Sequence, residues 1–460
     1  MHLNQKDSRH QQKQIIHHAQ TTDAYSFFNL LTSPQLLSVV EEHLPAHRER
    51  LYPPTTTLSL FLAQAMNTDA SCQHTVNRHA VERVFNGLSP CSILTGAYCK
   101  ARQRLPVAMV SSLVKQTGGM IAEQAPVPWH WQGRPVKLVD GTTVSLPDTP
   151  ANQRGYPQQR NQQPGLGFPI ARIVAVLCLA SGTVLDAAMG PFTGKGTGEH
   201  ALFRGLVEGL APGEVIVADR YYCSYFLIAT LIEKGVDVVF QQHGVRKTDF
   251  RKGQQLSPRD HIVTWHKPQV MPDWMSKEQY EAFADTLTIR ELKVGERILV
   301  TTLLCDNEAP KKALAALYQQ RWHAELDLRH IKSTLGMDVL TCKTPVMVEK
   351  EMWVYLLAYN LIRLLMAQAA VQAGLTPRQL SFKHTLQIWI LWSRQQFGAS
   401  DMEHTAMLFT WIASQRAGQR PGRTEPRAVK RRPKPYPLLM RPRAEARVEL
   451  VRQGYPRRLK

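Results

Sequence analysis

The sequence predicts an α/β protein, with a mixed sheet flanked by helices and a helical region before it. Short apolar runs rich in β-branched residues follow one another from residue 134 onward. The stretches on either side carry apolar residues at helical spacing instead. Three strands in a row, followed by a strand, a helix and a strand, indicate a sheet with both antiparallel and parallel neighbours. The strands are expected at 134–140, two within 171–190, and then at 214–219 and 237–243.

The order of these patterns divides the chain into five parts. Residues 1–127 are expected to form a helical N-terminal domain, and residues 128–243 the first part of the core. Residues 244–305 form a β-rich insertion, expected to leave the sheet and return to it. Residues 306–415 complete the core and continue into C-terminal helices, and residues 416–460 form a basic tail.

Charge points to a polyanionic partner. The 460 residues carry a formal net charge of +19, and Lys and Arg bind phosphates by displacing counterions.

Seven scattered cysteines with no CxxC pair argue against a zinc ribbon or a disulfide framework, and favour a cytoplasmic protein. The polar N-terminus lacks a signal peptide pattern, and the apolar stretch around residues 352–366 is interrupted by Asn360 and Arg363. No membrane partner is therefore expected.

Two acidic residues are expected where neighbouring strands end. Asp140 closes the run 134–140, and Asp219 closes the run 214–219. Acids at the carboxyl edge of an α/β sheet can face one crevice. Together they would repel each other, and a divalent cation with oxygen ligands removes that repulsion. Each acid alone is better explained as a helix cap or turn residue, and it is the pair that favours a metal site.

A third acid lies in the stretch YQQRWHAELDLRHIK, residues 318–332. Tyr318, Arg321, Glu325 and Lys332 fall within roughly 60° of one another on a continuous helix. Such a face presents a carboxylate for a metal and two cations for phosphates. A solvated helix face with an Arg321–Glu325 ion pair explains the same pattern.

These motifs resemble those of the bacterial DDE transposases of the insertion-sequence-four family. The family's third motif has Tyr, Arg, Glu and Lys at the spacing of Tyr318, Arg321, Glu325 and Lys332. LVDGTTV around Asp140 and VIVADRYYCSYF around Asp219 are similar to its first and second motifs. The resemblance covers roughly residues 90–370, including YCKARQRLP at 98–106.

The resemblance implies an RNase H-like core that cuts and joins DNA using two Mg²⁺ or Mn²⁺ ions. Asp140, Asp219 and Glu325 would be the catalytic, metal-binding triad, and Tyr318, Arg321 and Lys332 would contact DNA. The N-terminal domain would bind transposon ends, which relatives bring together as a dimer before cutting through a hairpin intermediate. Relatives also hold a flipped base on a tryptophan of the insertion, for which Trp265 is the candidate and Trp274 the competitor.

Three other functions remain open at this stage. One is a metal-dependent nuclease of the same fold without strand transfer. Another is a catalytically silent DNA-binding protein derived from a transposase. A third is a tyrosine recombinase, because Arg and His residues surround Tyr318 in the sequence: Arg321, His323, Arg329 and His330. Their proximity to Glu325 and the two strand-end acids favours the metal site over this alternative. The glycine-rich stretch at 194–200 lacks the ending of a P-loop and is interpreted as a flexible loop near the site.

Overall fold

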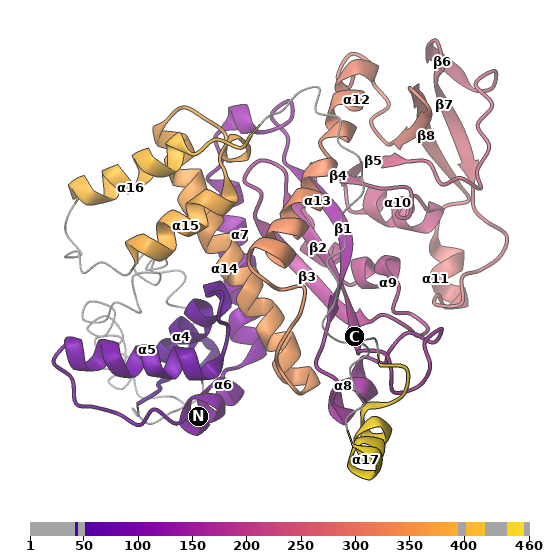
Figure 1. Ribbon diagram of the computed structural model, residues 1–460. Coiled ribbons are helices and arrows are strands. Elements are labelled where there is room, and N and C mark those ends of the chain that lie inside the picture. The colour runs from indigo at the N-terminus through magenta and orange to yellow at the C-terminus, as the bar shows by residue number, and fades with distance from the viewer. Residues whose placement is uncertain (1–41, 45–50, 394–401, 419–438, 455–460) are drawn as a thin grey trace, which may run out of the picture.

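The computed structural model describes residues 42–44, 51–393, 402–418 and 439–454. At its centre is one nine-stranded sheet in the order β3-β2-β1-β4-β5-β9-β8-β7-β6 (Figure 1). The first five strands are β1 Val136–Ser145, β2 Ile170–Cys178, β3 Val184–Pro191, β4 Val215–Ala218 and β5 Asp237–Gln241. β1, β2 and β3 pair antiparallel, whereas β1 with β4 and β4 with β5 pair parallel. This is the RNase H-like arrangement, as expected.

Both faces of this sheet are buried around β1, β2, β4 and β5. Leu138 packs into the larger hydrophobic core, and its neighbour Val139 packs into the second core on the opposite face. Because successive side chains of a strand point to opposite sides, a strand buried on both sides is apolar throughout, as these runs are. The second core contains α9 Glu199–Arg204 and α10 Tyr225–Glu233. A short helix, α8 Pro150–Gly155, follows β1.

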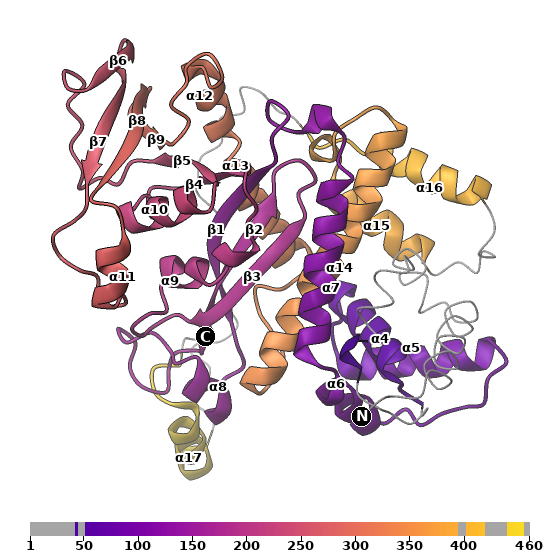
Figure 2. The same ribbon diagram turned by 180° about the vertical axis from the view of Figure 1, so that it is seen from behind.

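The larger core is built around one long helix, α14 Pro345–Gln372. This helix is apolar enough to span a bilayer, but 89% of its most apolar window is buried in the protein. It packs beside α7 Val107–Glu123 and close to β3 (Figure 2). The remaining N-terminal helices are α4 Pro54–Met66, α5 Cys72–Phe85 and α6 Gly96–Arg104. Of the helical domain expected over residues 1–127, residues 1–41 and 45–50 lie outside the described part of the chain.

The insertion extends the sheet instead of leaving it, and in this respect the expectation was wrong. Its elements are β6 Gln254–Ser257, β7 Asp260–His266, α11 Lys277–Ala282, β8 Thr286–Val294 and β9 Arg297–Thr301. β9 pairs antiparallel with β5, and β8, β7 and β6 follow outward. A physical reason is that β5 would otherwise present an edge of unpaired backbone groups, which β9 satisfies.

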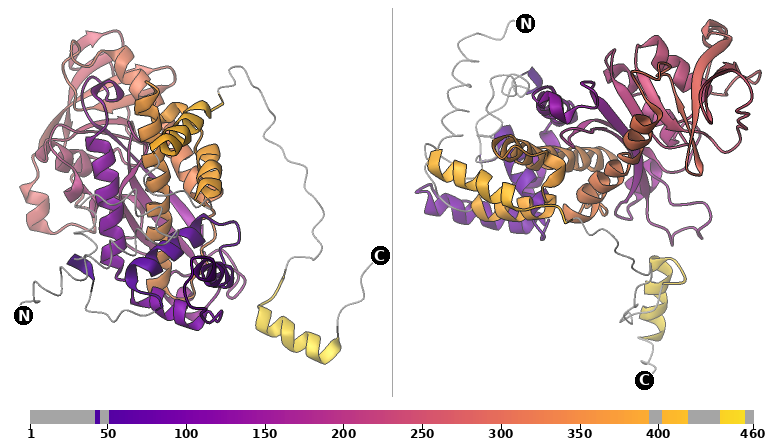
Figure 3. Two further views of the ribbon diagram at one scale, coloured as in Figure 1. Left: turned by 90° about the vertical axis from the view of Figure 1, so that its left-hand side faces the viewer. Right: turned by 90° about the horizontal axis from the view of Figure 1, so that it is seen from above.

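The C-terminal part is helical but more divided than expected. Its elements are α12 Lys311–Gln319, α13 Trp322–Arg329, the π-helical turn η4 His330–Thr334, η5 Pro377–Gln379, α15 Phe382–Trp392 and α16 Met402–Ser414. α15 and α16 pack against α14 (Figure 3). The basic tail includes a further helix, α17 Arg443–Gln453, although residues 419–438 lie outside the described part.

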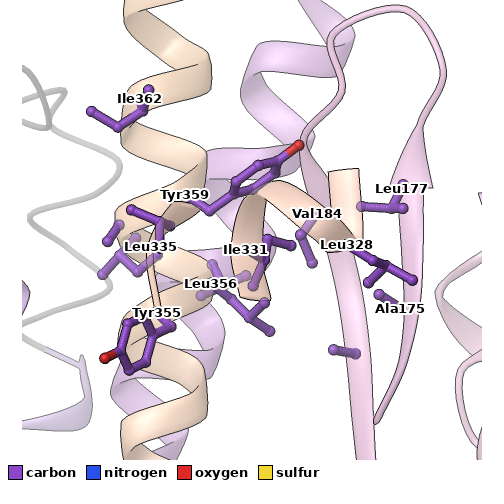
Figure 4. Close-up of a cluster of buried hydrophobic side chains, with 14 of the residues drawn as sticks. Ala175, Leu177, Val184, Leu328, Ile331, Leu335, Tyr355, Leu356, Tyr359 and Ile362 are labelled. Carbon is purple, nitrogen blue, oxygen red and sulfur yellow. The ribbon is translucent and has the colours of Figure 1, made fainter. Parts of the chain in front are cut away.

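The continuous helix expected over residues 318–332 is therefore wrong. The backbone N–H groups of Gln320, Arg321 and His323 each bond to the carbonyl three residues back, so tight turns replace an α-helical turn there. Hydrophobic packing fixes the helix that follows. Leu328 and Ile331 lie between α14 and the β2–β3 hairpin (Figure 4). Glu325 is thus held on a helix anchored against the sheet.

Candidate active site

Asp140 and Asp219 lie side by side on neighbouring parallel strands. In the register of β1 and β4, Leu138 pairs with Val217, and each acid comes two residues later. Asp219 directly follows β4, as expected. Asp140 does not end its strand, because β1 continues to Ser145 through its antiparallel pairing with β2. The acid is nevertheless at the edge of the crevice because β4, the shorter neighbour, stops beside it.

Arg321 joins the third acid to the first. Its Nη1 lies 3.6 Å from Oδ2 of Asp140, and its Nη2 lies 2.5 Å from Oε1 of Glu325. One guanidinium therefore spans both carboxylates, so these two acids from distant parts of the chain face the same crevice. The predicted Arg321–Glu325 pair is present, together with a contact that helical spacing could not show.

Burial raises the pKa of Asp140 to about 6. The backbone N–H of Gly141, which donates to Oδ1 at 2.8 Å, and the Arg321 guanidinium oppose this rise, whereas Asp219 and Glu199 add to it. Burial also raises the pKa of Glu199, again with a contribution from Asp219. Asp140, Asp219 and Glu199 thus form an electrostatically coupled group.

The acids suit a hard divalent cation by their chemistry, because Mg²⁺ prefers carboxylate oxygens. In the part of the chain that the structure describes, no three His, Cys, Asp or Glu side chains converge closely enough to hold one metal ion as they stand. The guanidinium of Arg321 lies between two of the expected ligands. Metal binding by all three acids would therefore require their side chains to reorient around this cation.

The other predicted DNA contacts are less exposed than expected. Tyr318 is 5% exposed, and its hydroxyl donates to Oε1 of Gln241 at the end of β5. Lys332 lies in η4 and is half-buried. Tyr318, Arg321 and Lys332 are thus distributed over α12, the junction and η4, and not along one helical stripe.

Trp265 is placed as a structural residue, which corrects its expected role as a surface for a base. It is 3% exposed, its indole N–H donates to Glu291 at 2.7 Å, and Arg246 covers its ring at 3.6 Å from the ring centre. Its competitor Trp274 is 45% exposed, with Arg204 stacked 3.8 Å from its ring centre. Trp265 is buried because it lies on the packed face of β7, whereas Trp274 lies outside the strands of the insertion.

The structure has a cleft beside Asp219 that the sequence did not predict. This cleft, called the smaller cavity below, has a volume of about 580 Å³, and its wall includes Arg172, Glu199, Asp219 and Arg220. Glu199 belongs to the stretch that was expected to be a loop near the site. The residue itself was missed because it opens a short helix after several glycines, which is a common and uninformative pattern.

A larger cavity of about 1260 Å³ adjoins it and shares Tyr221, His243 and Val245 with it. Its basic and aromatic lining comes from the loop after β3, from α9 and from the insertion after β5. The residues are Lys195, Arg204, Arg246, Lys247 and Trp274. Basic side chains that contact phosphates, together with an exposed aromatic ring on which a base can stack, are typical of proteins that bind single-stranded nucleic acid.

The surroundings of Tyr318 do not form a tyrosine-recombinase site. His323 and His330 lie near the buried arginines of the helical core, and burial lowers the pKa of each to about 4. His330 stacks on Phe382, and the hydroxyl of Tyr318 is engaged by Gln241. These histidines pack into the core instead of surrounding the phenol.

Asp327 likewise has a structural role. It is fully buried on α13, where Arg363 of α14 pairs with Oδ1 and Arg378 contacts both carboxylate oxygens at 2.7 Å. Arg378 also donates to the carbonyls of Cys178 and Leu179 at the end of β2. The helix that carries Glu325 is therefore tied to the sheet by a buried ion-pair network.

The chain is similar to known transposases over most of its length. It is 29% identical over 420 residues to "Transposase InsG for insertion sequence element IS4" of Escherichia coli (strain K12), an alignment that covers 88% of this chain and 91% of that protein. It is 26% identical over 140 residues to "Putative transposase InsZ" of the same organism, covering 30% of this chain and 46% of that one.

A solved structure, the piggyBac transposase synaptic complex with hairpin DNA, aligns over 89% of this chain and 88% of its own. The TM-score is 0.42 at 11% identity, and a similarity this low does not by itself establish a common fold. Residues 131–361, half of the chain, match the family described as "Transposase DDE domain", and this range contains Asp140, Asp219 and Glu325. The chain is therefore a member of the DDE transposase family.

Proposed function

We propose that this protein cuts DNA at the ends of an insertion sequence of the IS4 family and joins those ends to target DNA. One observation supports this most strongly. Asp140, Asp219 and Glu325 face a single crevice within the matched DDE domain, with Arg321 between two of them. The complete Tyr318, Arg321, Glu325 and Lys332 spacing and the similarity to InsG support the assignment to this family.

Asp140, Asp219 and Glu325 would hold two Mg²⁺ or Mn²⁺ ions. Bound there, such ions activate the attacking water or 3′-hydroxyl and stabilise the leaving oxygen of a phosphodiester. The protein orients these acids through β1, β4 and α13. Arg321, already in the crevice, can turn its guanidinium from the carboxylates to a phosphate, for which its forked donors are suited.

The remaining polar groups of the signature would position DNA. Lys332 would supply a point charge for a phosphate near the cleaved end. Tyr318 is buried, and its backbone carbonyl accepts from the N–H of Arg321, so it would fix the turn from which Arg321 reaches the DNA. We assign the contact with an unpaired base to Trp274 instead of Trp265, since Trp274 has an exposed ring on the wall of the larger cavity. The proposal has four further parts. Residues 1–127 bind the transposon ends, and two copies of the protein form the synaptic complex. Cleavage proceeds through a hairpin intermediate, and the protein is cytoplasmic and associated with the nucleoid.

The direct test is cleavage of a labelled transposon-end duplex with Mg²⁺. We expect Asp140→Asn, Asp219→Asn and Glu325→Gln each to abolish strand cleavage while leaving end binding largely intact. The matched control is Asp148→Asn, which removes an exposed carboxylate beyond the end of β1. The protein with this change should cleave the duplex as the parent does. Cleavage that survives one of the three changes would remove that residue from the triad.

Two outcomes would replace the proposal. Cleavage that ignores the terminal inverted repeats, with no joining to target, would identify a nuclease without strand transfer. End binding without any Mg²⁺-dependent cleavage in the unchanged protein would identify a silent DNA-binding descendant of a transposase.

A further inference from the structure

The connection between β1 and β2, residues 146–169, extends past the acids of the crevice. β4 ends beside Asp140, whereas β1 continues to Ser145 before this β1–β2 connection begins. An antiparallel strand rises about 3.4 Å per residue, so Ser145 lies about 17 Å beyond Asp140. Successive phosphates of one DNA strand are about 3.4 Å apart along the helix axis, so this distance corresponds to about five base pairs. DNA whose cleaved phosphate lies at Asp140 can therefore reach the connection.

The β1–β2 connection is held in one conformation by its own side chains. Hairpin loops usually have about two to five residues, so a connection of this length needs internal support. The amide of Gln158 provides such support. Its Oε1 accepts the backbone N–H groups of Gly165 at 3.0 Å and Gly167 at 3.2 Å, and its Nε2 donates to two carbonyls of the same loop. Because the conformation is already fixed, little entropy is lost when such a surface binds a ligand.

The β1–β2 connection is also tied to the segment that follows Lys332. The N–H of Ser145 donates to the carbonyl of Asp338 at 3.0 Å. Beyond β1, the buried amide of Asn152 donates to the carbonyl of Cys342 at 3.1 Å. Lys332 is the proposed contact for a phosphate near the cleaved end. The duplex that this lysine would hold is therefore the one that passes the connection.

The exposed face of the β1–β2 connection is basic and rich in amides. Arg154 and Arg160 are exposed, and within the described part of the chain neither of them forms an ion pair. The only acid of residues 146–169 is Asp148, which accepts a hydrogen bond of 2.9 Å from Gln153. A cavity of about 500 Å³ opens on this face, and its wall includes Arg160 and several glutamines. Arginine and amide side chains are common donors to the phosphates of DNA.

We propose that the β1–β2 connection binds phosphates of the transposon-end duplex, about five base pairs from the cleaved phosphate. This inference rests on the proposed function, because it places the cleaved phosphate at the three acids. Arg154 and Arg160 form charge-assisted hydrogen bonds with phosphates, and the neighbouring amides donate further ones. Gln158 is a positioning residue, because its hydrogen bonds hold the loop that carries Arg160.

The experiment measures binding of the full-length protein to a labelled transposon-end duplex by fluorescence anisotropy at several salt concentrations. Each phosphate contact contributes about one to the slope of log affinity against log salt concentration. We expect Arg154→Ala and Arg160→Ala each to lower this slope by about one, and the double change to lower it by about two. Gln158→Ala leaves both arginines in place but frees the loop, so it should weaken binding with a smaller change in slope.

Two comparisons locate the contact. Arg251→Ala removes a strongly exposed arginine just before β6, which is the end of the sheet formed by the insertion, and this variant should bind as the parent does. A neutral methylphosphonate placed about five base pairs from the cleaved phosphate should weaken binding to the parent. The same DNA change should have little effect on the double variant of Arg154 and Arg160, because the contact is already lost there.

A double variant that keeps the salt slope of the parent would overturn the inference. The inference would also fail if the double variant bound the end duplex normally but joined it poorly to target DNA, since the connection would then face the target. Cleavage by the parent, measured on the same duplex, separates these results from failure of the proposed function. If the parent cleaves while the double variant binds as the parent does, only the role of the connection is refuted. If the parent does not cleave, the proposed function itself fails.

Discussion

Removing the charge of Asp140 should stabilise the metal-free protein, by an amount that grows with pH. Burial raises the pKa of this carboxyl from 3.8 to about 6, and its side chain is only 18% exposed. Each unit of difference in pKa between the folded and unfolded chain corresponds to about 1.4 kcal/mol. Near pH 7.5, ionised Asp140 therefore destabilises the fold by about 3 kcal/mol compared with a neutral residue.

The direction follows from which state binds the proton more tightly. Below the unfolded pKa of 3.8 the carboxyl is protonated in both states and has no effect. Between 3.8 and about 6 the unfolded chain has released the proton but the folded chain retains it, so stability declines as pH rises. Well above pH 6 the carboxyl is ionised in both states, and the fold bears the full destabilisation of about 3 kcal/mol. At pH 5 about half of this destabilisation is present.

The assay is urea unfolding of the parent and of Asp140→Asn in the presence of EDTA at several pH values. The variant's excess free energy of unfolding should increase by about 1–2 kcal/mol between pH 5 and pH 7.5. Saturating Mg²⁺ should reduce the excess, because a bound cation favours the ionised carboxylate. Glu208→Gln removes one surface carboxylate and is the charge-matched control.

An excess that is constant over this pH range, or that shrinks as pH rises, would refute the reasoning. Either result would mean that the desolvation of Asp140 does not dominate its interactions with Gly141 and Arg321.

Three other predictions concern the fold and DNA binding. Asp327→Asn leaves Arg363 and Arg378 without their buried partner, and should lower the free energy of unfolding by about 3–5 kcal/mol in chemical denaturation. Gly118→Ala would place a Cβ atom 2.1 Å from the carbonyl oxygen of Val184, so the α7–β3 contact must open; we expect a loss of about 1–3 kcal/mol in the same measurement, and an unchanged value would contradict the packing. With a net charge of +19, affinity for end DNA should fall steeply and linearly with salt on logarithmic axes in fluorescence anisotropy, and salt-independent binding would argue against phosphate contacts.

The pattern of the strands could be predicted because it depends on short-range properties. The hairpin of β2 and β3 follows from two apolar runs around Gly182, whose φ of +77° suits glycine. The runs of β4 and β5 are apolar because both faces of the sheet are covered. Their spacing along the chain was enough to predict a mixed sheet with helices on both sides.

Two details of the site depended on pairing partners far away in the chain. β1 runs past Asp140 because β2 continues to pair with it, and the sequence of β1 alone does not show where that pairing ends. The path of residues 318–332 depends on Asp327 meeting two arginines and on Leu328 packing against the sheet. Helical periodicity describes an isolated helix and cannot include such forces.

The sequence by itself predicted the class of fold and the three acids as candidates, because apolar periodicity and motif spacing are written in consecutive residues. Only the tertiary structure decided that Trp265 is buried while Trp274 is exposed, that Arg321 lies between Asp140 and Glu325, and that Glu199 lies against Gly141. Burial and the approach of distant segments result from the packing of the whole chain. No local pattern around residues 199, 265 or 274 contains that information.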